Sequence, residues 1–392
     1  MEPRRSTLLS KINLRFGPVA ILLLAAIIIT GCSTTKSLKP GQNLYTGAQV
    51  KINPDSARRL KDEKSTRKLL ESKTRPRPNK RILGIPFKLL IYNLAGEPTK
   101  NKGFRYWLRN KVGEPPVLAS EVKIKLNNDI LTSTLISQGY LQATVTGDTI
   151  TKNRKTKAIY TANTGVRYKI NRITFPDDTS SISRIINENK QNTLLKVGNY
   201  YDLDVYKDER VRIDNDLKER GYFYFNPDYL IIQADSTIGK NLVNLWVRVK
   251  PIAPEESQKP YIINDITVYP NYILQRDSLI RKTPPLVYGD LKIIDRRNTF
   301  KPQVFDRLIF FDTGEVYNRK DHNLSLNRMV NVGMFKYVKA DFVPTDSLKS
   351  NKLDLTFYLT PLKRNSLSLQ TTLTNKSNNF VGSEIRVNQL FR

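Results

Sequence analysis

The chain has 392 residues, enough for two or three folded domains, and carries 65 Lys and Arg against 36 Asp and Glu, a formal net charge of +29. It has one cysteine and one histidine, which excludes an internal disulfide framework and a metal centre built from several Cys and His ligands.

The chain begins with a secretory leader. Basic residues at positions 4, 5, 11 and 15 precede an apolar run over 18–29, which is shorter than the roughly 20 residues of a membrane-spanning helix. The run ends in Ile29-Thr30-Gly31-Cys32, and this ending resembles the bacterial lipobox. We therefore expect cleavage after residue 31 and lipid on Cys32, with an uncleaved anchor or another cleavage site as the alternatives. Ser33 follows the cysteine where an Asp would favour inner-membrane retention, so we expect the outer membrane.

The basic charge is concentrated near the N-terminus, with 18 Lys and Arg against 5 Asp and Glu between Lys51 and Lys111. Because an exported lipoprotein does not meet the genome, we expect no nucleic-acid partner. Two interpretations stay open. The surface binds anionic lipid, lipopolysaccharide or acidic partners, or it is a basic surface without a dedicated ligand.

An opening strand is predicted over 44–52 and is followed by an unusual basic insertion, 53–110. The insertion contains a predicted basic helix over 55–71 and a Pro/Arg connector over 73–81. Aromatic and aliphatic residues then interleave with Arg and Lys, as in Phe104-Arg105-Tyr106-Trp107. This pattern is compatible with a membrane interface, but we favour packing inside an enlarged first module.

Internal repeats follow. Tyr168–Phe175 resembles Tyr261–Val268, and both alternate apolar and polar residues as the first strand of a unit does. A glycine-centred turn, a helix and a second glycine also recur. The glycine pairs are 113 and 139, 198 and 221, and 314 and 333. The second glycine of each pair suits the left-handed position that ends a helix.

Each helix between these glycines is predicted to be amphipathic, and two strands follow it. The predicted buried faces are Val122, Leu126 and Ile130; Tyr206, Ile213 and Leu217; and Leu326, Met329 and Val330. The strands are predicted over 141–149 and 157–163, over 222–232 and 241–250, and over 336–342 and 352–360. The sequence therefore predicts an α+β fold of two-layer strand–helix–helix–strand–strand modules, repeated three times.

This order, with the ending Gly221-Tyr222-Phe223, resembles the POTRA domains that precede the outer-membrane barrel in the BamA/TamA family. With the lipobox, it resembles the lipidated Tam-type branch of Bacteroidetes. The resemblance covers about residues 44–361. The expected domains are a leader, 1–31; module one, 32–164, with its insertion; module two, 165–251; module three, 260–361; and the start of a transmembrane β-barrel, 362–392.

The last segment alternates apolar and polar residues on both sides of a predicted turn at Asn378-Asn379, which is typical of barrel strands. Because a barrel must close to satisfy its edges, we expect the chain to be a fragment of a longer protein. The alternative is an edge hairpin on the third module.

No catalytic constellation is found, so we expect no enzyme activity, no cofactor and no metal. The single histidine, His322, is expected on the surface near a helix start.

The resemblance implies an outer-membrane biogenesis factor whose modules lie in the periplasm and deliver unfolded outer-membrane protein clients to the barrel. Partner proteins of the Tam or Bam type are implied as well. We expect clients to bind by β-augmentation on the strand after the helix pair of a module. The predicted partner-binding residues are Ala143, Val145, Phe225 and Ile231. The alternative is an envelope lipoprotein without a barrel that acts as an adaptor or scaffold.

Overall fold

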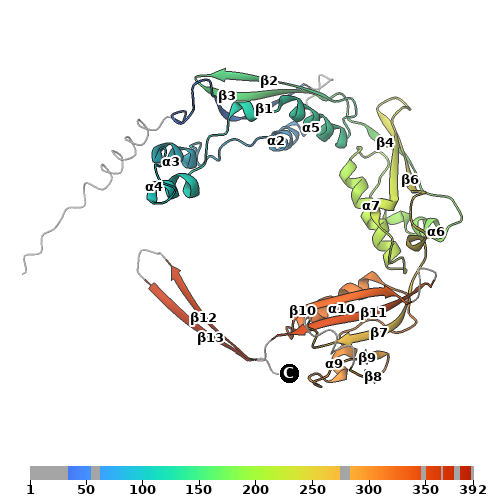
Figure 1. Ribbon diagram of the computed structural model, residues 1–392. Helices are drawn as coiled ribbons and strands as arrows, with labels where there is room; N and C mark the ends of the chain where they lie inside the picture. Colours follow the sequence, from blue (N-terminus) through green and yellow to red (C-terminus); the bar gives the residue numbers. More distant parts are fainter. Residues whose placement is uncertain are drawn as a thin grey trace, which may run out of the picture. The chain divides into compact units, whose positions relative to one another are not determined.

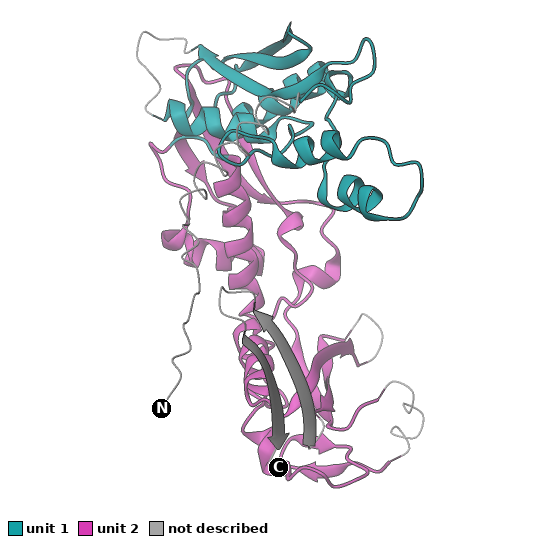
Figure 2. Ribbon diagram, turned by 90° about the vertical axis from the view of Figure 1, so that its left-hand side faces the viewer, with its two compact units in different colours: residues 1–169, 200–202 teal, residues 170–199, 203–392 magenta. Residues whose placement is uncertain are grey.

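The computed structural model describes residues 34–53, 62–273, 283–345, 350–362, 365–374 and 380–389 (Figure 1). The leader and the predicted lipid acceptor Cys32 lie outside these residues. The chain forms two compact units (Figure 2). Unit 1 contains residues 1–169 and 200–202, and unit 2 contains residues 170–199 and 203–392. Within the described ranges, no helix combines the length and apolarity needed to cross a bilayer.

Unit 1 is built on a three-stranded sheet of order β1-β3-β2, namely β1 (Leu44–Asn53), β2 (Thr144–Lys152) and β3 (Lys155–Asn163). The central β3 is parallel to β1 and antiparallel to β2. Helices α2 (Glu63–Lys73) and α5 (Ile124–Ser137) pack on it through Leu70, Leu131 and Leu135, which share a core with Val50 and Tyr160. Along the chain, α2 and α5 are separated by α3 (Phe87–Ala95), α4 (Phe104–Trp107) and a π-helical turn, Leu108–Val112.

The first sheet of unit 2 has the order β4-β6-β5, with β4 (Lys169–Thr174), β5 (Leu230–Asp235) and β6 (Leu242–Val249). Its helices are α6 (Ser181–Glu188) and α7 (Leu203–Lys218). The predicted face of α7 is confirmed, because Tyr206, Ile213 and Leu217 are all buried.

The second sheet of unit 2 has five strands, in the order β10-β11-β7-β9-β8. They are β7 (Ile262–Tyr269), β8 (Leu286–Tyr288), β9 (Leu291–Ile293), β10 (Phe335–Pro344) and β11 (Lys352–Pro361). Helices α9 (Pro302–Asp306) and α10 (Arg319–Asn331) accompany it. The short hairpin β8–β9 was not predicted.

The chain ends in β12 (Asn365–Thr374) and β13 (Phe380–Gln389), which pair antiparallel. The predicted hairpin is therefore confirmed, and the turn at Asn378-Asn379 lies outside the described residues. The two strands form a sheet of their own rather than extending the five-stranded one. The alternative of an edge hairpin on that sheet is thus not observed.

The α+β class and the small two-layer units agree with the sequence prediction, but several details differ. Leu126 and Val330 were predicted to be buried and are exposed. The strand predicted over 222–232 begins only at Leu230, because the chain turns over Asn226–Tyr229. The helix predicted over 55–71 is observed as α2 from Glu63, and residues 54–61 are not described.

Candidate functional site

The segment before the second helix of a module performs one structural task three times, and in unit 2 that segment is the recurring glycine-centred turn. In unit 1, Leu44 of β1 pairs antiparallel with Leu118. The Tyr45 N–H donates to the Val117 carbonyl at 2.8 Å. The segment before α5 therefore occupies the start of the outer edge of β1.

The same arrangement recurs twice in unit 2. The Ile170 N–H on β4 donates to the Asn199 carbonyl at 2.8 Å, and the Gly198 N–H donates back to Ile170 at 2.8 Å. On β7, the Ile263 N–H donates to Glu315 at 2.8 Å and receives the Gly314 N–H at 2.7 Å. We call this backbone pairing of the segment before the second helix with the first strand the edge clamp.

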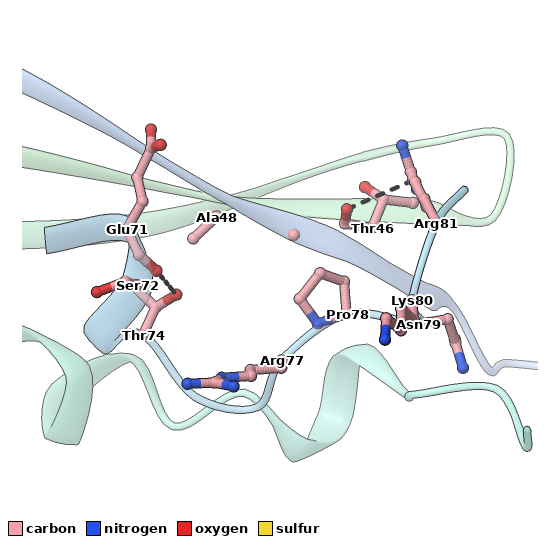
Figure 3. Close-up of a pocket in the computed structure, with 11 residues that line it drawn as sticks. Thr46, Ala48, Glu71, Ser72, Thr74, Arg77, Pro78, Asn79, Lys80 and Arg81 are labelled. Carbon is pink, nitrogen blue, oxygen red and sulfur yellow. Dashed lines mark hydrogen bonds between the residues drawn. The ribbon is translucent and has the colours of Figure 1, made fainter. Parts of the chain in front are cut away.

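More of the β1 edge is covered by side chains from α2 and from the connector that follows it. The Val50 N–H donates to Glu71 Oε1 at 3.1 Å, and the Arg81 guanidinium approaches the Thr46 carbonyl at 3.5 Å. A pocket of about 460 Å³ lies between β1 and the connector. Figure 3 shows Arg81 beside Thr46 and Pro78 between the connector and the strand. An added strand would have to displace this cover.

The opposite edges are open. Strand β2 is an edge strand of the sheet in unit 1, and β5 is an edge strand of the three-stranded sheet in unit 2. No described strand pairs with the outer side of either. Such an edge presents unpaired N–H and C=O groups that can bind an extended chain. Each of the two three-stranded sheets therefore has one clamped edge and one open edge.

The structure places the four predicted partner-binding residues at or just before these open strands. Ala143, Val145 and Phe225 are buried in the core, whereas Ile231 is exposed. The first three side chains therefore stabilise the strands from inside rather than facing a partner. Sequence alternation could not have separated Phe225 from Ile231, because residues six apart on one strand share a face, and Phe225 in fact lies before β5 begins at Leu230.

The two sheets of unit 2 are joined through the Gly-Tyr-Phe ending of α7. Gly221 has φ +97 and accepts a hydrogen bond from the Tyr261 N–H at 2.9 Å. Phe223 then inserts among aromatic rings of the second sheet, with its centroid 4.9 Å from Tyr317 and 5.1 Å from Phe342.

An ion pair reinforces this junction. The Asp214 carboxylate on α7 is buried, and its Oδ2 accepts hydrogen bonds from Arg319 Nη1 on α10 at 3.0 Å and from Lys218 Nζ at 3.0 Å. His322 lies one turn after Arg319, with Nδ1 3.1 Å from the Tyr317 hydroxyl. Burial, and then the charge of Arg319, lower the pKa of His322. His322 thus lies near the start of a helix, as predicted, and is half-buried rather than fully on the surface.

Within the described ranges, no group of three or more His, Cys, Asp or Glu side chains is arranged to hold a metal ion. The open edges are thus the strongest candidate site, and their chemistry is main-chain hydrogen bonding.

Comparison with known proteins gave solved structures only. No family model matches the chain, and no curated protein matches it. POTRA domains 3–5 of Haemophilus influenzae BamA are 12% identical, with 83% of this chain and 100% of that chain covered and a TM-score of 0.40. Haemophilus ducreyi BamA lacking POTRA domains 1–3 is 13% identical, with 57% of this chain and 34% of that chain covered and a TM-score of 0.36. CdiB from Acinetobacter baumannii is 15% identical, with 57% of this chain and 35% of that chain covered and a TM-score of 0.23. The match spans about a third of these last two chains, and none of these scores assigns the chain to a family.

Proposed function

We propose that the chain is a lipid-anchored outer-membrane biogenesis factor of the BamA/TamA type, from the Tam-like lipidated branch. Its POTRA-like modules lie in the periplasm, receive unfolded outer-membrane protein clients and pass them to a barrel that begins near residue 362. Three observations support this proposal. They are the lipobox at Cys32, the recurring α+β unit with its edge clamp, and the separate hairpin β12–β13.

The observation that carries the mechanism is the asymmetry of the three-stranded sheets. An extended client adds to β2 or β5 through main-chain hydrogen bonds, which demand little of the client sequence. The clamp occupies the start of the first strand in each module, and in unit 1 Glu71 and Arg81 cover more of β1, so we expect the client to bind on the opposite side. An unfolded barrel strand is suited to this edge because its own backbone groups are unpaired before insertion.

The junction in unit 2 suits this task. Phe223 and the Asp214–Arg319 pair hold the first sheet against the second, whose last strand β11 leads after three residues to β12. A client bound on β5 would therefore be held on the same compact unit from which the proposed barrel starts.

Photo-crosslinking in living cells tests the client site. The exposed side chains Thr146 on β2 and Gln233 on β5 are replaced one at a time by a photoreactive amino acid, with the exposed Lys51 on β1 as the matched control. We expect crosslinks to unfolded outer-membrane proteins at the first two positions and few at the third. Equal crosslinking at all three positions would refute edge-specific capture.

The anchor is tested separately. We expect radiolabelled palmitate to enter the wild-type chain and not the Cys32→Ala variant, which should leave the membrane fraction unless a barrel holds it. The parent reading frame decides between the barrel and the adaptor. Several hundred further residues of alternating strands support the barrel, and their absence would support the adaptor.

A further inference from the structure

The insertion of unit 1 exposes large apolar side chains that the sequence suggested would be packed. Leu83 is 95% exposed, Phe104 73% and Trp107 50%. Ile82, Ile85, Phe87 and Leu94 are exposed as well. These seven residues all fall within residues 82–107, which we call the interfacial segment. The expectation of packing inside an enlarged module is wrong for these side chains.

The local structure turns these side chains outward. Ile82 pairs with Ile85 across a tight turn, and Leu83 stands at its tip with φ 50, a backbone conformation that is rare for a bulky residue. On α3, Leu89 and Asn93 face inward, whereas Phe87 and Leu94 are seven residues apart and share the outer stripe.

The rings of α4 are ordered against each other. Phe104 and Trp107 stack with their centroids 6.0 Å apart. Because both are exposed, this contact orders the rings without burying them in the module.

The end of α3 in the interfacial segment is held by contacts with the π-helical turn. Arg109 donates to the Gly96 carbonyl at 2.6 Å and to the Tyr92 hydroxyl at 2.8 Å, and its guanidinium lies 3.9 Å from the Tyr92 ring centroid. A Cβ on Gly113 would stand 2.7 Å from the Arg109 carbonyl oxygen and 3.0 Å from the Tyr92 Cα. Glycine therefore lets α3 and the following π-helical turn approach closely, as Figure 1 shows for α3 and α4.

The charge around these residues favours an anionic bilayer as the occupant. Residues 80–111 contain eight Lys and Arg and one acidic residue, Glu97. Cations at the rim of an exposed apolar surface meet lipid phosphates while the apolar side chains enter the acyl boundary. A folded protein partner would instead require polar complementarity on its own surface.

The chain itself places this surface close to the proposed lipid. Ser37 Oγ donates to Asn93 Oδ1 on α3 at 2.6 Å, and Leu38 packs with Leu89 of the same helix. Five residue steps separate Cys32 from Ser37, so their Cα atoms lie at most about 18 Å apart whatever path the chain takes. A lipid on Cys32 would hold α3 within reach of the bilayer.

We infer that the interfacial segment docks on the anionic inner leaflet of the outer membrane and serves as a second contact beside the lipid. The docked face would be the Leu83 turn, the outer stripe of α3 and the Phe104–Trp107 pair. The inference deepens the proposed function, because it rests on the proposed anchor for the position of the membrane. Beyond that function, the inference assigns to the folded module a surface that binds the bilayer independently of the acyl chains on Cys32.

Vesicle binding tests the inference on the chain from Ser33 onward, which lacks the leader and the lipid acceptor. Trp246→Phe leaves Trp107 as the sole tryptophan, since the chain has two. Its fluorescence is followed with vesicles of phosphatidylethanolamine and phosphatidylglycerol and with vesicles of phosphatidylcholine. We expect a blue shift with the anionic vesicles that weakens in high salt and with neutral lipid. No shift with the anionic vesicles overturns the inference.

Variants locate the contact. Leu83→Asn, chosen because asparagine tolerates positive φ, and Phe104→Ser should each lower the vesicle partition coefficient about tenfold. Ile252→Ser is the matched control, because Ile252 is 78% exposed but lies outside the segment. An equal loss in the control overturns the inference and indicates non-specific binding. Palmitate labelling of the full chain carrying Leu83→Asn should stay at the wild-type level, so failure of the anchor and failure of the segment are separable.

Discussion

Arg319 on α10 donates to the buried carboxylate of Asp214 on α7 at 3.0 Å, and this contact links the two sheets of unit 2. Asp214 also binds Lys218, so two cations neutralise one buried acid.

We expect Asp214→Ala to lower the free energy of unfolding by about 2 kcal/mol, because hydrogen bonds between charged groups are lost while Arg319 and Lys218 remain partly solvated. Arg319→Ala should cost less, since Lys218 still neutralises the acid. Urea unfolding with a double-mutant cycle measures the coupling between the two residues. The exposed pair Arg210 and Asp228 provides the control, with an expected coupling of about 0–1 kcal/mol. A coupling for Asp214 and Arg319 no larger than the control would contradict a role in the junction.

Gly221 should not tolerate a side chain. A Cβ there would stand 2.7 Å from Val316 Cγ1 and 3.0 Å from Pro260 Cβ, in a backbone with φ +97. Gly239→Ala is a matched control, because its φ is +79 and no atom lies within 4 Å of the added Cβ. We expect the control to cost about 1–2 kcal/mol from backbone strain alone and Gly221→Ala to cost more. Thermal unfolding of the two variants measures the difference. Equal losses of stability would show that the residues around Gly221 can move aside for the added Cβ.

The stability of the junction should depend on pH through His322. Its pKa is lowered in the folded chain, first by burial and then by Arg319. The unfolded chain, with its His pKa near 6.5, therefore binds more protons than the folded chain below that pH. The free energy of unfolding should fall as pH drops through about 6.5 towards the lowered folded pKa. Urea titrations at pH 8 and pH 5.5 measure this, and His322→Gln should flatten the dependence in this window. An unchanged slope in the variant would assign the effect to other groups.

Proline can separate the docking role of β5 from its folding role. Successive strand residues direct their N–H groups to opposite sides, so one of Ile231 and Ile232 faces β6 and the other faces outward. We expect one proline variant to lose about 3 kcal/mol or more of stability. The other should keep its melting temperature and lose client crosslinking at Gln233. Val145 is less suitable for this test because its side chain is buried and serves the core. Full client capture by the stable variant would argue against augmentation on β5.

Local signals in the sequence predicted much of this fold. The closing glycines 139, 221 and 333 all have positive φ, as expected for residues that end helices. The backbone bonds of the edge clamp were not predictable, because they join distant segments such as Tyr45 and Val117, and the recurring glycines of unit 2 indicated only the turns.

The face of α5 was misjudged for a different reason. Its buried residues are Asn127, Leu131 and Leu135 rather than Leu126. Asn127 is buried because its amide donates to the Tyr160 hydroxyl at 2.7 Å and to the Arg75 carbonyl at 2.7 Å. A polar residue on the buried side interrupts the regular spacing of apolar residues, and the buried face of a helix is predicted from that spacing. An exposed apolar surface on the insertion was considered but not favoured, because an apolar residue is usually buried.

The edge clamp also sets a stoichiometry. Because the first strand of each three-stranded sheet is clamped at its start, we expect the sheet to add one strand on its other side and not to pair head to tail with a copy of itself. The number of client strands held at once would then scale with the number of sheets rather than with their width. A chain with more such modules would gain capacity without gaining a tendency to polymerise.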